Sequence, residues 1–151
     1  MLKLKEDIMS YLKEHFSENG YFPNIKIVES NLYNNYLERE QITVSIVDES
    51  EELRFTTFEN AEINNVAIQI NCYGLQRKMD GVARTAMYVS EFIAEIAEIA
   101  FNKRFITKYN ENIKSIRKVS TIPPMPLKEG SQVYVTILRY ELLVDYDYIK
   151  K

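Results

Sequence analysis

The stretch QVYVTILRYELLVDYDY, residues 132–148, carries the strongest structural signal in the chain. In its first half, Val133, Val135 and Ile137 place apolar side chains at odd positions. In its second half the apolar positions are even, namely Leu138, Tyr140, Leu142, Val144 and Tyr146. Because strand side chains alternate between two faces, the pattern predicts one long strand. Its inward face changes part-way, through a bulge, a twist or a second set of neighbours.

A strand of this length exceeds the usual ~5–6 residues, and two arrangements explain it. One half can serve the core of its own subunit while the other half contacts a neighbouring subunit, which is typical of an assembly protein. Alternatively, the whole strand bends within one monomer. Its tyrosines Tyr140, Tyr146 and Tyr148 are interleaved with Asp145 and Asp147. This negative charge disfavours base stacking on a polyanion and favours packing against another protein.

Length and composition predict a single domain over residues 1–151. Hydrophobic residues make up 46% of the chain and charged residues 27%, which is enough apolar material for one core. The formal net charge of −3 disfavours a general phosphate-neutralising surface, so we expect no specific nucleic-acid binding. No stretch approaches the roughly 20 apolar residues of a membrane span, and no membrane contact is expected.

Hydrophobic periodicity predicts an α+β fold. We expect a mostly antiparallel sheet of four to five strands, with a long helix and an N-terminal amphipathic helix packed on it. In the N-terminal helix, residues 2–16, the apolar positions recur every four residues at Leu4, Ile8, Leu12 and Phe16. The long helix, residues 82–101, has a stripe of small and branched residues: Ala86, Val89, Ile93, Ala97 and Ala100. Strands are expected at residues 24–29, 41–48, 65–73, 113–121 and 132–148.

Turn and charge signals mark the first connections. Residues 48–52 are predicted to form an acidic connection. Residues 53–62 are predicted to form either another strand or a protruding hairpin arm. Residues 74–81 are predicted to form a loop with a glycine at each end, in which Asp80 caps the long helix.

Two further expectations concern residues 113–126. In the strand expected at residues 113–121, the side chain of Ile116 is expected to face the core, and so is that of Val119. The run PPMP, residues 123–126, is expected to leave the sheet as an extended surface loop, because proline cannot donate to a strand ladder.

The sequence has no pattern for catalysis or metal binding. His15 is the only histidine and Cys72 the only cysteine, so neither a zinc-type cluster nor an internal disulfide is expected. Cys72 lies within a strand alternation and is expected to be a buried, inert thiol. The phosphate-loop, dinucleotide and nucleophile-elbow motifs are absent. We therefore expect no enzyme activity, no catalytic residues, no cofactor and no metal site.

The order of the predicted elements resembles that of the tail terminator and tail-completion (collar) proteins of long-tailed bacteriophages and phage-tail-like contractile particles. The matching pieces include the N-terminal helix and the strand pair at residues 24–29 and 41–48. They also include VAIQINCYG, residues 66–74, followed at once by the long helix. IRKVSTIPPMPL, residues 116–127, and a closing strand rich in Tyr and Asp complete the resemblance.

The resemblance implies a structural protein. In that family the subunits form a six-membered ring that caps the tail tube, stops its polymerisation and connects to the neck or sheath. The implied partners are further copies of the chain, the tail tube protein, and the sheath and neck proteins, with DNA passing through the ring. Assembly in the bacterial cytoplasm and a place in a virion or tail-like particle are also implied.

On this interpretation the subunit and partner contacts lie on surface segments instead of a pocket. The expected contact residues are Asp48, Glu49, Glu51, Glu52, Arg54, Arg77, Lys78, Asp80, Tyr140, Tyr146 and Tyr148. The alternative function is a small soluble ligand- or peptide-binding module without catalytic activity.

Overall fold

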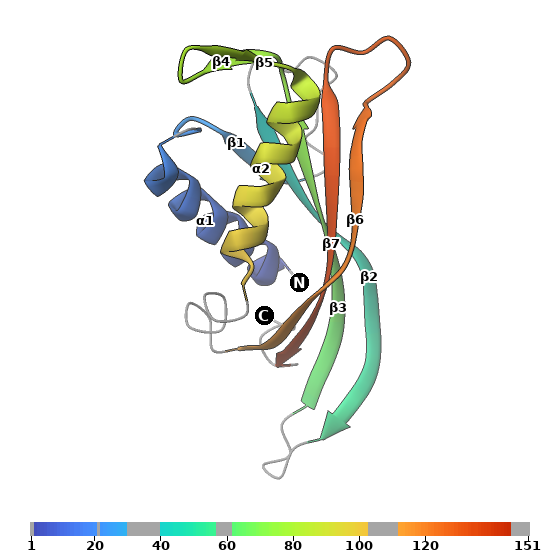
Figure 1. Ribbon diagram of the computed structural model, residues 1–151. Helices are drawn as coiled ribbons and strands as arrows, with labels where there is room; N and C mark the ends of the chain where they lie inside the picture. The colour runs from blue at the N-terminus through green and yellow to red at the C-terminus, as the bar shows by residue number, and fades with distance from the viewer. Residues whose placement is uncertain (1, 21, 30–39, 57–61, 103–111, 146–151) are drawn as a thin grey trace.

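A computed structural model gives the arrangement of two helices and seven strands among the residues it describes (Figure 1). It describes residues 2–20, 22–29, 40–56, 62–102 and 112–145, and at residues 2, 19, 47–56 and 62–64 the backbone alone. The elements are α1 (Leu2–Asn19), β1 (Lys26–Glu29), β2 (Gln41–Thr56), β3 (Glu62–Gly74), β4 (Arg77–Met79), β5 (Val82–Arg84), α2 (Ala86–Ala100), β6 (Ile113–Pro126) and β7 (Tyr134–Asp145).

Five strands form the main sheet, in the order β1-β2-β3-β7-β6. The β1–β2 pair is parallel, and the other three pairs are antiparallel. Strands β4 and β5 form a separate two-stranded hairpin. The α+β prediction with a largely antiparallel sheet is therefore confirmed.

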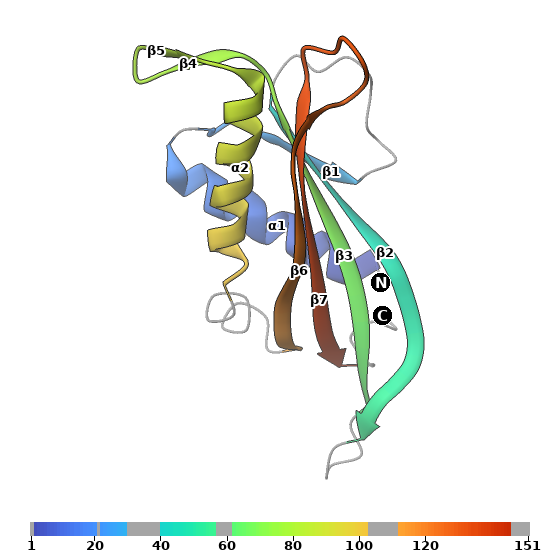
Figure 2. The ribbon, with the colours of Figure 1, turned by 45° about the vertical axis from the view of Figure 1, so that its right-hand side comes forward.

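Both helices cover the same face of the sheet, and the main core lies between these two layers (Figures 1 and 2). The predicted periodicity accounts for this packing. Leu4, Ile8, Leu12 and Phe16 of α1 are buried, and so is the whole predicted stripe of α2. The sheet contributes alternate residues, with Ile68, Ile70, Leu138 and Leu142 fully buried beneath the helices.

The change of face in the last strand has its explanation inside the monomer. The β3–β7 register runs without a shift from Ile63 opposite Asp145 to Gly74 opposite Tyr134, so this pair contains no bulge. Val135 and Ile137 belong to a second, smaller apolar cluster together with Tyr73. Because Leu138 is in the main core and its neighbour Ile137 in this cluster, the two clusters occupy opposite faces of β7.

The last strand is also an interior strand. Strand β7 lies between β3 and β6 and pairs with both. The described part of this strand, residues 134–145, therefore pairs on both sides within one monomer and has no open edge for a neighbouring subunit. Asp145 forms an ion pair with Lys114 on β6, at 3.6 Å.

The acidic residues 48–52 are part of a strand and not a connection. Strand β2 continues through them to Thr56, which pairs with Glu62 of β3. The predicted hairpin arm is thus confirmed, and we call residues 48–56 and 62–64 the β2–β3 arm. The arm runs past the ends of both helices (Figures 1 and 2). Three register shifts, between Ile46 and Phe55, allow β2 to hold more residues than β3 opposite it.

The predicted loop before α2 is a hairpin. Asp80 and Gly81 connect β4 to β5, and both have positive φ, 52° and 79°. An Asp-Gly pair is favoured in two-residue hairpin turns because these turns need positive φ. Asp80 is therefore not the helix cap. Thr85 takes that role, since its hydroxyl oxygen accepts a hydrogen bond from the Tyr88 N–H at 3.1 Å.

The proline-rich run does not leave the sheet. Strand β6 extends to Pro126 and pairs with Tyr134 of β7. Because β6 pairs with β7 alone among the described strands, its other side makes no ladder bonds there, and prolines are tolerated. Val119 lies between the shifted pairs of Lys118 and Ser120 and is 54% exposed, so its inward placement was wrong. Ile116 packs against the core as expected.

Close packing of α2 on the sheet requires a glycine at the end of β3. A Cβ built on Gly74 would lie 2.3 Å from the Ser90 backbone nitrogen and 2.6 Å from the Ala86 carbonyl oxygen. Beside this contact the buried hydroxyls of Ser90 and Thr136 form a hydrogen bond of 3.0 Å between α2 and β7. The backbone of the helix thus rests directly on that of the strand.

Replacing Gly74 by alanine should therefore displace α2. We expect Gly74→Ala to destabilise the fold by about 3 kcal/mol or more, because the added methyl meets helix backbone instead of a flexible side chain. The control is Gly130→Ala, where φ is +77° but nothing lies within 4 Å; there we expect about 1 kcal/mol. Urea denaturation monitored by circular dichroism measures both. Equal midpoints for the two variants would contradict the close-packing role.

Candidate functional site

The face of the sheet turned away from the helices carries a row of polar side chains. On β3, the Gln69 amide donates to the Asn71 side-chain oxygen at 2.9 Å. The Asn71 amide donates in turn to the Tyr73 hydroxyl at 3.3 Å. Arg139 of β7 donates through Nε to Gln69 Oε1 at 3.0 Å. These bonds between neighbouring side chains hold the outer face in a fixed arrangement of donors and acceptors.

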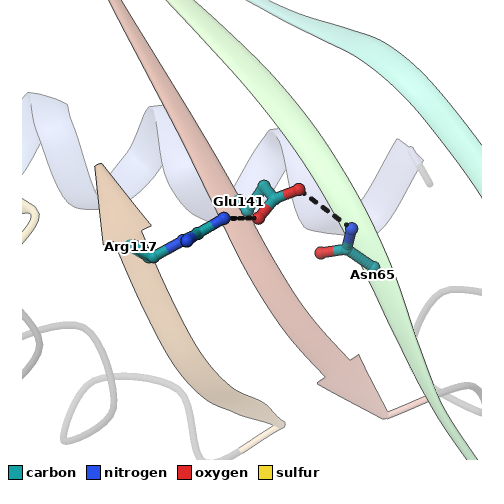
Figure 3. Close-up of polar contacts among 3 residues, drawn as sticks. All are labelled: Asn65, Arg117 and Glu141. Carbon is teal, nitrogen blue, oxygen red and sulfur yellow. Dashed lines mark hydrogen bonds and ion pairs between the residues drawn. The ribbon is translucent and has the colours of Figure 1, made fainter. Parts of the chain in front are cut away.

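A three-residue polar contact continues this row toward the β2–β3 arm (Figure 3). Glu141 of β7 lies between Asn65 of β3 and Arg117 of β6. The Asn65 amide donates to Glu141 Oε1 at 3.2 Å. Arg117 forms an ion pair with Glu141 Oε2 through Nη2. The register explains the meeting, because Arg117 and Glu141 are directly opposite each other in the β6–β7 pair.

A hollow of about 290 Å³ lies over this contact and is lined by Asn65, Ser115, Arg117, Glu141 and Leu143. Its lining contains one carboxylate, and both oxygens of that carboxylate already accept bonds. A pair of carboxylates for acid–base catalysis is therefore not present in the lining. The Arg117 side chain is 70% exposed, and its guanidinium has further N–H donors for an anionic or amide group.

The described residues do not contain a group of three or more His, Cys, Asp or Glu side chains that could hold a metal ion. Cys72 is fully buried on the helix-covered face of β3, as its alternation predicted. Burial raises the pKa of its thiol. A protonated, solvent-inaccessible thiol is a poor nucleophile.

The structure separates the predicted contact residues into groups. Tyr140 is buried, and its ring lies 5.1 Å from that of Phe101 between the sheet and α2. The pKa of the Tyr140 hydroxyl is raised, mainly by burial and to a smaller extent by the negative charge of Glu98 and by Cys72. Tyr140 is thus a core residue, and its assignment to a partner surface was wrong. Tyr146 and Tyr148 lie outside the described residues.

The segments that carry the other predicted contact residues lie at opposite ends of the sheet. The backbone of Asp48, Glu49, Glu51, Glu52 and Arg54 belongs to the β2–β3 arm. Arg77, Lys78 and Asp80 belong to the β4–β5 hairpin, at the far end in both views (Figures 1 and 2). The two groups therefore do not form one site within the monomer.

Within the hairpin the three residues have different environments. Arg77 lies 5.1 Å above the Phe22 ring and 3.5 Å from a Glu40 carboxylate oxygen, so it holds the hairpin to the body of the molecule. Asp80 occupies the turn. Lys78 and Asp80 are both exposed, whereas Arg77 is half-buried.

Several surface residues were missed by the sequence analysis. Asn65, Arg117 and Glu141 come from three strands, and only the strand register shows that they meet. Exposed apolar side chains occur in the hairpin, in α2 and on β6, at Val82, Met87, Tyr88, Ile99, Val119 and Met125. The helical pattern of α2 signals Ile99, because it falls outside the buried stripe.

Comparisons with known proteins add no functional assignment. No protein-family model matches the chain, and a search of curated proteins gave no match. Among the described residues, no helix is long and apolar enough to cross a membrane.

The buried environment of Cys72 gives a direct test. Because burial raises the thiol pKa, the native protein holds it protonated, and thiol modification at pH 8 should be at least about 100-fold slower than in the urea-unfolded chain. The unfolded thiol ionises near pH 8.5, so stability should decline as the pH rises above that value. Modification kinetics with a chromogenic disulfide measure the first effect. Equal rates in the native and unfolded chains would show that the thiol is accessible.

Proposed function

We propose that this chain is a structural subunit of a phage tail or phage-tail-like particle. It forms a ring that caps the tail tube as a tail terminator or collar, stops tube polymerisation and connects to the neck or sheath. The proposal rests on the resemblance in element order and on the shape of the subunit. It assigns the chain no catalytic role.

The β2–β3 arm is the observation that supports the proposal most directly. The arm continues the sheet beyond the ends of α1 and α2 (Figure 1). A two-stranded hairpin is marginally stable alone, so an arm of this kind gains stability when another surface covers it. Contact between subunits, or with the tube, supplies such a surface.

The proposed mechanism is geometric. A closed ring needs a heterologous interface, in which one surface of a subunit meets a different surface of the next. The ring covers the last layer of the tube and presents a new face to the neck or sheath. The chain's net charge of −3 suits a ring through which DNA passes without being retained.

Oligomeric state is the first prediction. We expect six-fold rings with a central hole, and a six-subunit mass. Native mass spectrometry across a concentration series, with negative-stain electron microscopy of the same sample, measures both. Because the tube end can act as the template for the ring, the samples should include polymerised tail tube protein of the same particle. Tubes that grow at the same rate with and without the chain, together with a strictly monomeric chain, would contradict the proposal.

The hollow on the outer face favours the second candidate, a ligand- or peptide-binding module without catalytic activity. The Arg117 guanidinium, which is exposed although it pairs with Glu141, and the Asn65 amide offer hydrogen-bonding groups for a carboxylate or an extended peptide. A thermal-shift screen of small carboxylates and short peptides tests this function. Stabilisation that disappears in Arg117→Ala and persists in Lys13→Ala, an exposed lysine on α1, would favour it over the ring.

A further inference from the structure

Among the described strands, each side of the main sheet ends in a strand with no partner beyond it. Strand β1 covers β2 only where Lys26–Glu29 pairs with residues 41–44. From Ser45 to Thr56 no described strand lies on that side of β2. At the opposite side, β6 pairs with β7 alone among the described strands. Each edge presents backbone N–H and C=O groups that a further strand can bond.

The two edges are open at the same height of the sheet. One row across the sheet runs from Ile46 through Ile68 and Tyr140 to Lys118, because each is the register partner of the next. Residues 113–120 of β6 contain no proline, and their rows meet β2 from Ser45 onward, where β1 does not cover it. Toward the β4–β5 end of the sheet, Met125 lies in the row of Gln41. There β6 has prolines on both sides of Met125, and β1 covers β2.

The two edges also carry opposite charges in their sequences. Residues 113–122 of β6 include Lys114, Arg117 and Lys118 and no acidic residue. Residues 45–56 of β2 include four acidic residues and one arginine. Each β6 cation also contacts a carboxylate of its own chain, but the three side chains stay 47%, 70% and 41% exposed. Exposed ion pairs of this kind are weak, so the cations can bind a second chain as well.

We infer that the β6 edge of one copy pairs with the β2 edge of the next copy, through residues 113–120 and 45–56. Within one copy, β2 runs parallel to β7 and antiparallel to β6. A ring axis keeps the strand directions of neighbouring copies alike, so the β6 edge of one copy and the β2 edge of the next pair in antiparallel fashion. Backbone bonds join the two sheets, and the basic and acidic edges select this pairing over others. This inference rests on the proposed ring and names its subunit interface.

The irregularities of both strands restrict the pairing to a matching partner. Three register shifts interrupt β2, and the prolines end the usable edge of β6. Bulges and prolines protect edge strands from indiscriminate association. A copy of the same chain, positioned by the charges, can still bond the short regular stretches, which are Ser115–Lys118 on β6 and residue pairs such as Ser45–Ile46 and Asp48–Glu49 on β2. The arrangement therefore explains an interface that is specific and limited in length.

Zero-length carbodiimide coupling of the wild-type protein tests the contact directly, because it joins only touching amines and carboxylates. We mix unlabelled and ¹⁵N-labelled protein and identify linked peptides by mass spectrometry. The expected products are mixed-isotope links from Lys114 or Lys118 to residues 48–52. Links from Lys114 to Asp145 and from Lys118 to Glu98, which are ion pairs within one chain, are the internal control. If these internal links form at millimolar protein and no mixed-isotope link joins the two edges, the inference is overturned.

Charge exchange provides the second test. Lys114→Glu with Lys118→Glu makes both edges acidic, and Glu51→Lys with Glu52→Lys makes both edges basic. Each double variant should weaken self-association about tenfold, and an equimolar mixture of the two should restore it. The control variant, Lys13→Glu with Lys128→Glu, has the same net charge as the first but alters exposed lysines elsewhere and keeps both edges, so it should associate like the wild type. Thermal melting verifies that every variant is folded.

The outcomes separate this inference from the proposed function. Rings that form equally in all variants, without edge links, would leave the ring in place and reject the edge pairing. Edge links and charge rescue, without rings or an effect on tube growth, would establish the pairing and reject the terminator role.

Discussion

The uninterrupted β3–β7 ladder is the constraint on which the rest of the structure depends. It joins Ile63 to Asp145 at one end and Gly74 to Tyr134 at the other, without a shift. The ladder fixes which side chains of both central strands face α1 and α2. It also fixes the position of Gly74, whose missing side chain lets α2 lie against the strand backbone. Irregularities are confined to the outer pairs, where β2 and β6 bend around this regular centre.

Repeating patterns were readable from the sequence wherever one face is buried. The every-fourth-residue pattern of α1 and the stripe of α2 predicted buried faces that the structure has. Local turn chemistry was harder, because Asp80 followed by glycine satisfies both a helix start and a two-residue hairpin turn. Only the short alternation on either side of it, in β4 and β5, selects the hairpin. The proline run was misjudged since proline is excluded from central strands but not from an edge.

The candidate site was less predictable than the fold, for a physical reason. Tyr140 shares the apolar face of Leu138 and Leu142, and the sequence does not tell whether the protein's own helices or a neighbouring subunit cover that face; the structure shows that the helices do. Asn65, Arg117 and Glu141 are far apart in the chain and meet through cross-strand register, which a single sequence does not give. Charge along one strand was readable, but the partner strand opposite it was not.

The inferred pairing of two complementary edges would favour closure into a ring. In a monomer both edges are sites for unwanted strand pairing, and the bulges of β2 and the prolines of β6 reduce but do not remove this liability. Pairing between unlike edges repeats the same contact from copy to copy, so it gives either a filament or, where the rotation per copy closes, a ring. Only closure satisfies every edge and stops growth. In the proposed terminator, a closed ring would leave no such edge for further copies to join.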